Sequence, residues 1–486
     1  MTDLTPVGRG ARALLIAALL ASSACIPTLN GLGMRDVNLD MPETFGPGGA
    51  TAASDALPHD ALFDDPHLVA LVDEALKNNK ELGIFTQEIN VSNAEIIARR
   101  GKVLPQLDLG VQPSVEKVGR YTSQGASDEA DDITPGHKVP ENLGNFRIEL
   151  HASWEIDIWK RLRNTTKAAR DRYLASVEGR NFLVTGLVAE ISNTYYELVA
   201  LDRQLEVLQS NIQILTDALE ATKLQLEAAR VTALAVQRFE AELAKQEGRQ
   251  FEIRQRIVET ENRLNVLVGR YPQHVDRSTD YFMVASLQGM DAGLPSQLLT
   301  RRPDVRAAEL ELEATKLDVK AARARFYPSL SIDARFGIEA FNPVNYASLP
   351  ASLLYSVAAD LLAPLLNRAE IKADYYSANA RQMQAVIGYE QTVLLAFVDV
   401  ANQLAAIGNT DETFLRKTRQ VEQLQLAIDT SNQLFRSARA DYLEVLTTRS
   451  EALEAEIDLV EVRQRQIAAR IDLYRALGGG WPDPQS

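Results

Sequence analysis

The sequence is short of the residues on which enzymes most often depend. Among 486 residues it has one cysteine, and its five histidines are scattered rather than set at a metal-binding spacing. No glycine-rich phosphate loop and none of the usual nucleophile motifs is found along it. We therefore expect a protein that is not an enzyme and that holds no cofactor or metal.

Positive charge and proline are also scarce. The formal net charge of -15 disfavours nucleic acid as a partner, because phosphate backbones are bound by basic surfaces. No proline occurs between Pro140 and Pro272, or between Pro364 and Pro482. Since proline breaks helices, these two stretches are free to form very long ones.

The N-terminus has the layout of an export signal. Arg9 and Arg12 precede an apolar run over 13–21, which is too short for a membrane-spanning helix. Small residues then lead into Cys25. Cys25 is either an unused thiol in a removed peptide or the lipidated first residue of the mature chain. The second alternative follows from the sequence Ser-Ser-Ala-Cys, which resembles a bacterial lipoprotein processing site. Ile26 after it fits sorting to the outer membrane.

One stretch alternates strictly between apolar and polar residues. From 146 to 158 every even position is apolar, Trp154 included, and every odd position is charged, His or Ser. As side chains alternate across a strand, this segment has one wholly apolar face. A soluble sandwich and a membrane barrel both use such strands, but the following sequence is helical and offers no second sheet. We predict a transmembrane strand, with Trp154 facing lipid near the middle of the bilayer.

The helical regions carry a coiled-coil repeat. Leucine or isoleucine recurs at alternating spacings of three and four from 198 to 219, which predicts a long helix over about 163–229. A second helix over 234–267 folds back along it. We also expect a single helix over 68–103, a strand at 107–111, an irregular exposed loop over 119–140, and a helix break near 408–409.

The chain contains two copies of one plan. Ala229 and Arg230 before Leu234 recur as Ala438 and Arg439 before Leu443, each pair 209 positions apart. The second copy has a helix over 302–326 that Pro328 ends, then alternating strands over 330–338 and 355–361. Each copy thus supplies two membrane-type strands and a helical hairpin. Four strands per chain cannot close a barrel, whereas three chains supply twelve, so we predict a homotrimer.

Four motifs give the chain a family resemblance. They span 301–309 (Arg-Arg-Pro-Asp-Val-Arg-Ala-Ala-Glu), 322–329, 153–163 and 472–481. With them the chain resembles the TolC-like outer-membrane efflux proteins, specifically their lipoprotein drug-efflux (NodT-type) branch. The resemblance implies a mainly α fold with a transmembrane β portion, a channel-tunnel in which a 12-stranded barrel stands on a coiled-coil helical barrel. It also implies the role of exit duct in a tripartite pump, with a periplasmic adaptor and an inner-membrane transporter as partners.

The resemblance places the two fold-backs at the periplasmic aperture. The residues it assigns there are Ala229, Arg230, Leu234, Ala438, Arg439, Asp441, Leu443 and Glu444. Leu443 corresponds to an aperture-lining leucine of the family, although a residue in the seam of the hairpin would look the same. Asp441 and Glu444 would give the mouth a preference for cations. The chain departs from the family in having alanine, not glycine, at 229 and 438, and Thr447 and Ser450 where relatives have charges.

The remaining motif residues are expected to be architectural: Arg302, Pro303, Asp304, Pro328, Trp154 and Asp157. Pro303 and Asp304 suit the first turn of a helix. We divide the chain into a signal peptide (1–24), an extended leader (25–66), a first repeat (67–272), an equatorial connector (273–297), a second repeat (298–478) and a tail (479–486).

Two alternatives to drug efflux stay open. One is a duct for metal ions or for type I protein export, within the same family. The other is a lipid-anchored periplasmic coiled-coil scaffold without a barrel. The four alternating segments disfavour the scaffold.

Overall fold

The computed structural model describes residues 26–27, 37–45, 63, 65–279, 282–283, 292–437 and 439–479. The predicted signal peptide, Cys25 and Ala438 lie outside these ranges. The chain forms two compact units, each containing part of both sequence repeats. One takes in 90–173 and 310–386, the other 37–89, 174–309 and 387–486.

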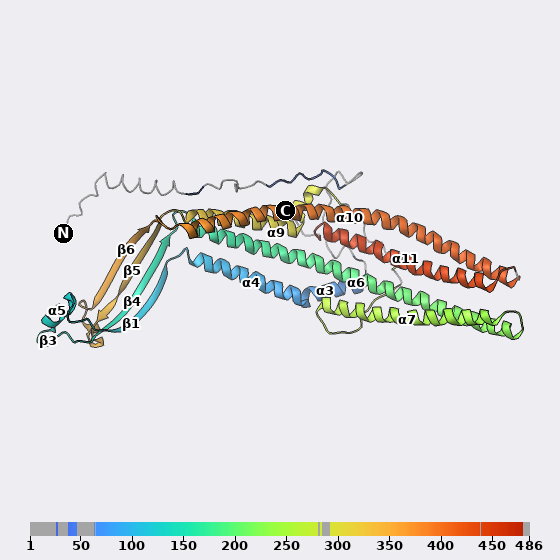
Figure 1. Cartoon of the computed structure of the whole chain (residues 1–486), viewed down its shortest axis with the longest axis horizontal. Coiled ribbons are helices and arrows are strands. Elements are labelled where there is room, and N and C mark those ends of the chain that lie inside the picture. The colour runs from blue at the N-terminus through green and yellow to red at the C-terminus, as the bar shows by residue number, and fades with distance from the viewer. Residues whose placement is uncertain are drawn as a thin grey trace. The chain divides into compact units, whose positions relative to one another are not determined.

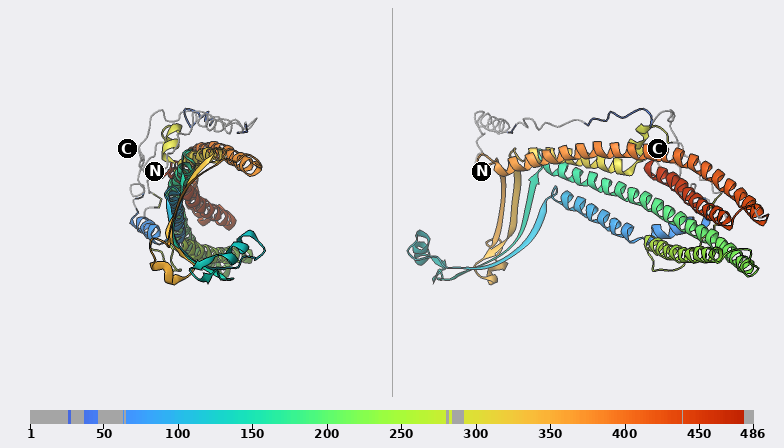
Figure 2. Two further views of the ribbon diagram at one scale, coloured as in Figure 1. Left: turned by 90° about the vertical axis from the view of Figure 1, so that its left-hand side faces the viewer. Right: turned by 45° about the vertical axis from the view of Figure 1, so that its right-hand side comes forward.

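The first unit contains an antiparallel sheet of four strands in the order β1-β4-β5-β6 (Figure 1). The strands are β1 (Gln106–Glu116), β4 (Leu143–Ile156), β5 (Ser329–Ala340) and β6 (Leu353–Leu362). All four were predicted, though β1 is longer than expected. In both views of Figure 2 they lie side by side, with β1 and β6 at the two edges.

The register divides the side chains into two faces. Leu109 opposes Leu150, Leu150 opposes Phe336, and Phe336 opposes Tyr355, all on one face. Alternate residues along each strand share this face. On this face all residues are apolar within the ranges Leu107–Val115, Phe146–Ile156, Leu330–Ala340 and Leu353–Leu361. The opposite face is mostly polar. The alternation is therefore confirmed on β1, β4 and β5. On β6 only the apolar face is confirmed, because Leu354, Ala358 and Leu362 lie on the opposite face.

The segment between β1 and β4 is more ordered than predicted. It contains helix α5 (Ser123–Ala130) and a short hairpin of β2 (Asp132–Thr134) and β3 (His137–Lys138). Thr122 caps α5 by accepting a hydrogen bond from Gly125 N at 3.1 Å. Polar composition led us to expect an irregular loop here, but local capping stabilises a short helix.

Long helices make up most of the described chain. In chain order they are α3 (Pro66–Asn78), α4 (Lys80–Gly101), α6 (Arg161–Glu227), α7 (Ala233–Val268), the short η1 (Pro295–Gln297) and α8 (Leu298–Arg301), α9 (Pro303–Ala324), α10 (Ala369–Arg436) and α11 (Tyr442–Ala476). A one-turn helix η2 (Pro343–Ala347) lies between β5 and β6. The two repeats match closely, since α6 and α10 have 67 and 68 residues and α7 and α11 have 36 and 35.

Two predicted helix boundaries were wrong. The helix expected over 68–103 is divided at Asn79, whose amide donates to Leu267 O at 2.7 Å and whose carbonyl oxygen caps α4 through Leu82 N at 2.9 Å. Conversely, α10 runs through Gly408 without a break. One glycine costs a helix only about 1 kcal/mol, which the rest of a 68-residue helix easily offsets.

The predicted coiled-coil seam forms the core of the second unit. Leu198, Leu201, Leu208 and Leu215 are almost completely buried. They belong to successive apolar clusters that join α6 to α7 and α11. The spacing of three and four therefore identified the buried face correctly.

Candidate functional site

The fold-back between α6 and α7 is made without glycine. Ala229 has φ 54, in the left-handed region that glycine normally occupies. Its N–H bonds Leu226 O at 2.9 Å, and Arg230 N–H bonds Gln225 O at 2.8 Å, which closes the end of α6. A left-handed backbone conformation that favours glycine is thus adopted here by alanine.

The second fold-back has the same capping pattern. Arg439 N–H bonds Leu434 O at 2.9 Å, and Asp441 stands at the N-cap of α11. Leu446 and Tyr442 pack into a cluster with Val236 and Phe239 of the first hairpin. Leu443 belongs to none of the apolar clusters described in this unit, and its side chain is 39% exposed. Leu234, at the equivalent position of α7, is 53% exposed. Glu444 lies in the first turn of α11.

Arg302 joins three helices of the second unit. It is 5% exposed and donates two hydrogen bonds to Asp304, at 2.9 and 2.6 Å. It also bonds Ala476 O at the end of α11 (3.0 Å) and contacts Asp399 of α10 (3.3 Å). Burial disfavours the charged form, but Asp304 and Asp399 raise the pKa of the guanidinium overall. Pro303 begins α9 directly after it.

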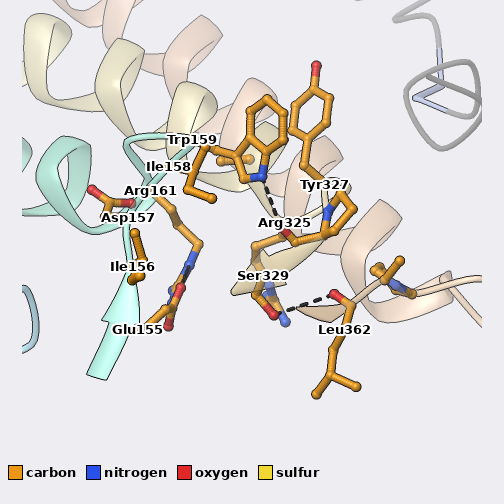
Figure 3. A pocket seen from close by; sticks show the side chains of 14 residues that line it. Glu155, Ile156, Asp157, Ile158, Trp159, Arg161, Arg325, Tyr327, Ser329 and Leu362 are labelled. Atoms are coloured by element: carbon orange, nitrogen blue, oxygen red, sulfur yellow. Dashed lines mark hydrogen bonds and ion pairs between the residues drawn. The ribbon is translucent and has the colours of Figure 1, made fainter. Parts of the chain in front are cut away.

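The remaining motif residues build the strand-to-helix junction of the first unit (Figure 3). Asp157 is buried and accepts hydrogen bonds from Leu162 N (3.0 Å) and Arg163 N (2.9 Å), so it caps α6. Trp159 stacks on Tyr327 with 4.6 Å between ring centroids and donates to Pro328 O at 2.8 Å. These residues border a cavity of about 520 Å³.

Trp154 lies on the apolar face, but nearer the end of the strand than predicted. It is two residues from the end of β4, and its indole N–H donates to Val103 O at 3.1 Å, just before β1. The middle of the strand is Leu150. We had expected Trp154 near mid-bilayer; its position instead suits the aromatic girdle at the membrane interface.

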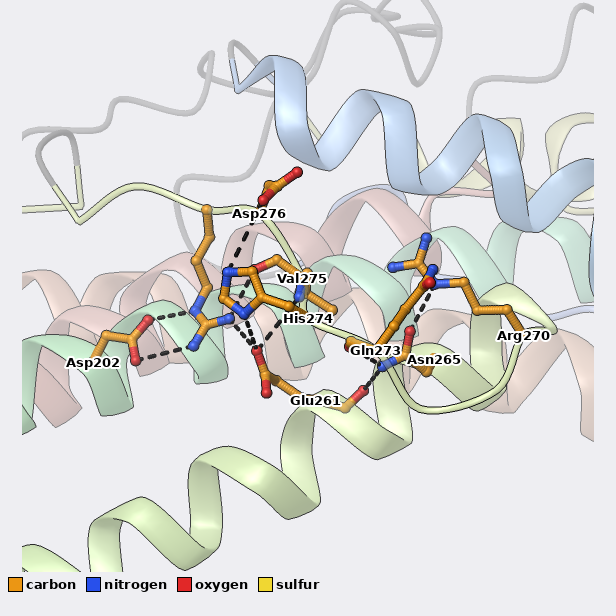
Figure 4. Close-up of polar contacts among 9 residues, drawn as sticks. Asp202, Glu261, Asn265, Arg270, Gln273, His274, Val275 and Asp276 are labelled. Atoms are coloured by element: carbon orange, nitrogen blue, oxygen red, sulfur yellow. Dashed lines mark hydrogen bonds and ion pairs between the residues drawn. The ribbon is translucent and has the colours of Figure 1, made fainter.

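Sequence reading missed a polar network at the connector (Figure 4). Arg277 is held by Asp202 of α6 and by Glu261 of α7, the latter at 2.5 Å. Burial disfavours its charge, yet the two carboxylates raise the pKa of Arg277. Glu261 also accepts from Val275 N at 3.4 Å and lies 3.2 Å from His274 Nδ1. No local pattern signals this network, because its members are brought together only by the fold.

The described faces and helices define a class of protein. A sheet with an apolar outer face, a polar inner face and two open edges, continued by coiled-coil helices, is a part of a membrane β-barrel with a helical extension. Among the residues described, one helix (Ala369–Phe435) is also long and apolar enough to cross a membrane by length and composition alone.

Comparison with known proteins identifies the family. The sequence profile of the outer membrane efflux protein family matches residues 71–270 and 294–479, so the chain belongs to this family. It is 28% identical to the pyoverdine export outer membrane protein OpmQ of Pseudomonas aeruginosa, over 96% of each chain. It is 27% identical to the solvent efflux pump outer membrane protein SrpC of Pseudomonas putida, over 91% of each.

A structural relative supports the fold. The cation efflux system protein CusC of Escherichia coli is 26% identical over 86% of this chain and 88% of its own. A crystal structure of CusC superposes with a TM-score of 0.80 at 22% identity, covering 91% of this chain and 99% of that one. The protein is thus an outer-membrane efflux channel with the channel-tunnel fold, and it serves as an outer-membrane exit duct.

Proposed function

We propose that the protein is the passive outer-membrane duct of a tripartite pump that exports drugs or other small toxic compounds. The observation that carries the proposal is the sheet: four strands, one face wholly apolar, and both edges unpaired. Open edges are not tolerated in lipid, so three protomers would have to close a barrel of twelve strands around a polar lumen. Transport energy would come from an inner-membrane transporter, and this chain would catalyse no reaction.

The exposed apolar surface of α10 supports self-association. Ile387, Leu394, Leu395 and Leu426 are each more than half exposed in the single chain. A contiguous apolar stripe on a helix is normally covered by a partner. Neighbouring protomers of the proposed trimer would cover it.

The two fold-backs would form the periplasmic aperture and contact the adaptor. The exposure of Leu443, beside neighbours that are packed into the cluster, favours a side chain directed to the pore over one in the hairpin seam. Asp441 and Glu444 would surround it with negative charge. Arg302, Asp304 and Asp157 would act only architecturally, because the hydrogen bonds described for them join elements of the same chain.

A lipid anchor at Cys25 is part of the same proposal. Ile26, the next residue, packs with Phe326, shortly before β5, and with Tyr375 in the second turn of α10, the helix that follows β6. Such seating would hold an acylated Cys25 close to the membrane. Labelling cells with an alkyne fatty acid tests the proposed acylation, with Cys25→Ala as the control. Absence of label on the wild-type protein would contradict a lipid anchor at Cys25.

A susceptibility panel tests the cargo. A deletion strain would be compared with the same strain carrying the gene, on antibiotics, dyes, detergents and metal salts. Sensitisation to several unrelated organic compounds supports the proposal. Sensitisation to metal salts alone would favour cation efflux, the activity in the name of CusC, and would overturn the proposal of drug export.

A further inference from the structure

The polar face of the sheet carries an excess of negative charge. Its carboxylates are Asp108, Glu116, Glu149, Glu155, Asp333, Glu339 and Asp360, against two arginines and one histidine. Three of them have a basic partner within the unit. Arg147 binds Glu339 (3.0 Å), His151 lies 3.3 Å from Asp333, and Arg161 binds Glu155 (2.6 Å). Asp108 and Asp360, on the two edge strands, have no basic partner among the described residues.

Glu149 is the unusual member of this group. It is only 7% exposed, and its Oε2 has no hydrogen-bond partner in the described part of the chain. The nearest cation, Arg335, lies 4.0 Å from the other oxygen, Oε1. A buried carboxylate oxygen without a partner is costly, so a missing partner is expected.

Glycines flank Glu149 on both neighbouring strands. In the register Glu149 opposes Gly110 of β1 and Gly337 of β5. A Cβ at Gly337 would lie 2.2 Å from Ile148 O, so that side is closed by backbone. A Cβ at Gly110 would lie 3.6 Å from Glu149 Cγ, in ordinary contact. Since Gly110 has no side chain, no Cβ at that position stands between Glu149 and the free edge of β1.

The internal repeat indicates what pairs with that edge. Pro105 before β1 corresponds to Pro328 before β5, an offset of 223. Arg161 after β4 corresponds to Arg368 after β6, an offset of 207, and the residues before them, Lys160 and Asn367, both have positive φ. The observed β4–β5 pairing therefore has a counterpart between β6 of one protomer and β1 of the next. Because Ser153 opposes Asp333, the offset of 207 sets the partner subunit's Asp360 opposite Gly110. The two hairpins, in which Gln106 opposes Ser153 and Ser329 opposes Leu362, align β4 with β6 at an offset of 209 instead and would set the partner's Leu362 there.

The strand tilt favours the register with the partner's Asp360, because the one with the partner's Leu362 would shift the path by eight residues over four strands, a tilt of roughly 54°. Following directly opposed residues across the sheet leads from Gly110 to Glu149, Gly337 and Leu354, and then to the partner's Glu116. The path has moved along the strand from position 110 to position 116 while crossing four strands. With about 3.3 Å per residue and about 4.8 Å between strands, the tilt is roughly 45°. Outer-membrane barrels have strands tilted by about 35–45°.

We propose that each subunit seam of the trimer binds a divalent cation between Glu149 and the partner subunit's Asp360, over Gly110. The Cα atoms of the two residues would be roughly 10 Å apart, which is two strand spacings. Because both side chains would extend toward the lumen and toward each other, the gap between their carboxylates would be short enough for a partly hydrated ion. Oxygen ligands of this kind suit Ca²⁺ or Mg²⁺, with water completing the shell.

The site rests on the proposed trimer, and the first test therefore concerns the register. Gly110→Cys combined with Asp360→Cys should give covalent trimers on mild oxidation, because directly opposed residues are close enough for a disulfide. Gly110→Cys with Leu362→Cys, the rival register two residues away, is the matched control, and Cys25 is common to both. Cross-linking of the control pair alone would overturn the register while leaving the trimer intact. Absence of any trimer would instead contradict the proposed function.

The second test measures cation binding on trimers extracted from the outer membrane. Millimolar Ca²⁺ should raise the temperature at which detergent-resistant trimers dissociate by roughly 5 °C over a chelator-treated sample. Glu149→Gln and Asp360→Asn should each abolish this rise, whereas Glu116→Gln, on the same face, should retain it. A rise that survives both substitutions, or no rise in the wild-type protein, would overturn the proposal.

Discussion

Lys160 and Asn367 occupy the same place in the two repeats, and both have a left-handed backbone, with φ 60 and φ 50. Each lies just before the arginine that follows a barrel strand and precedes a long helix. The duplication is therefore visible in backbone conformation as well as in sequence. It also means that the chain adopts a strained conformation at two junctions where glycine would be at ease.

Replacing Lys160 with glycine should stabilise the protein. A non-glycine residue in the left-handed region costs about 1 kcal/mol, which Lys160→Gly would relieve. We expect detergent-resistant trimers to dissociate at a temperature a few degrees higher. Lys167→Gly, an exposed lysine in the interior of α6, is the matched control and should lower that temperature by a similar amount. Equal effects of the two substitutions would argue against relief of strain at Lys160.

Leu443→Gly should widen the aperture. If three copies of this leucine narrow the pore, their removal should increase single-channel conductance in planar bilayers. Leu234→Gly, at the equivalent and also exposed position of α7, controls for loosening of a helix terminus. Unchanged conductance in Leu443→Gly, or the same increase in both, would remove Leu443 from the gate.

A cation on the apolar face should block membrane insertion in a depth-dependent way. Phe336 lies in the middle of β5 and is 56% exposed, so Phe336→Arg should cost about 2–4 kcal/mol in each protomer. Trp154→Arg, at the strand end, should cost only about 0–1 kcal/mol in transfer, plus its bond to Val103. Ser356→Arg, on the polar face, is the control. The measurement is the fraction of heat-modifiable trimer in outer membranes, and equal loss in all three variants would contradict the face assignment.

Arg277→Gln should destabilise the connector. It would leave Asp202 and Glu261 facing each other without the shared cation, at a cost of about 3–5 kcal/mol if the site stays buried. We expect faster proteolysis within the 270–279 segment and a lower dissociation temperature of the trimer. Arg203→Gln, which removes an exposed pair with Glu206, should have little effect. Proteolysis equal to that of the wild type would show that the network does not hold the connector.

Local periodicity in the sequence was enough to predict the elements whose residues repeat at a fixed spacing. Alternation marked the four strands and their shared apolar face, the spacing of three and four marked the buried leucines of α6, and the constant offset revealed the duplication. These signals depend on the periods of strand and helix, which any continuous segment displays. For the same reason the sequence misjudged Asn79 and Gly408, where packing and helix length outweigh local propensity.

Only the tertiary structure decided which distant side chains meet. Arg277 finds Asp202 across 75 positions, Arg302 reaches the end of α11, and Glu149 is buried between two glycines of other strands. Such pairings depend on register and on how helices pack, and neither leaves a local pattern in the chain. The strain at Ala229, Lys160 and Asn367 is of the same kind, because the surrounding fold, not the residue, imposes that conformation.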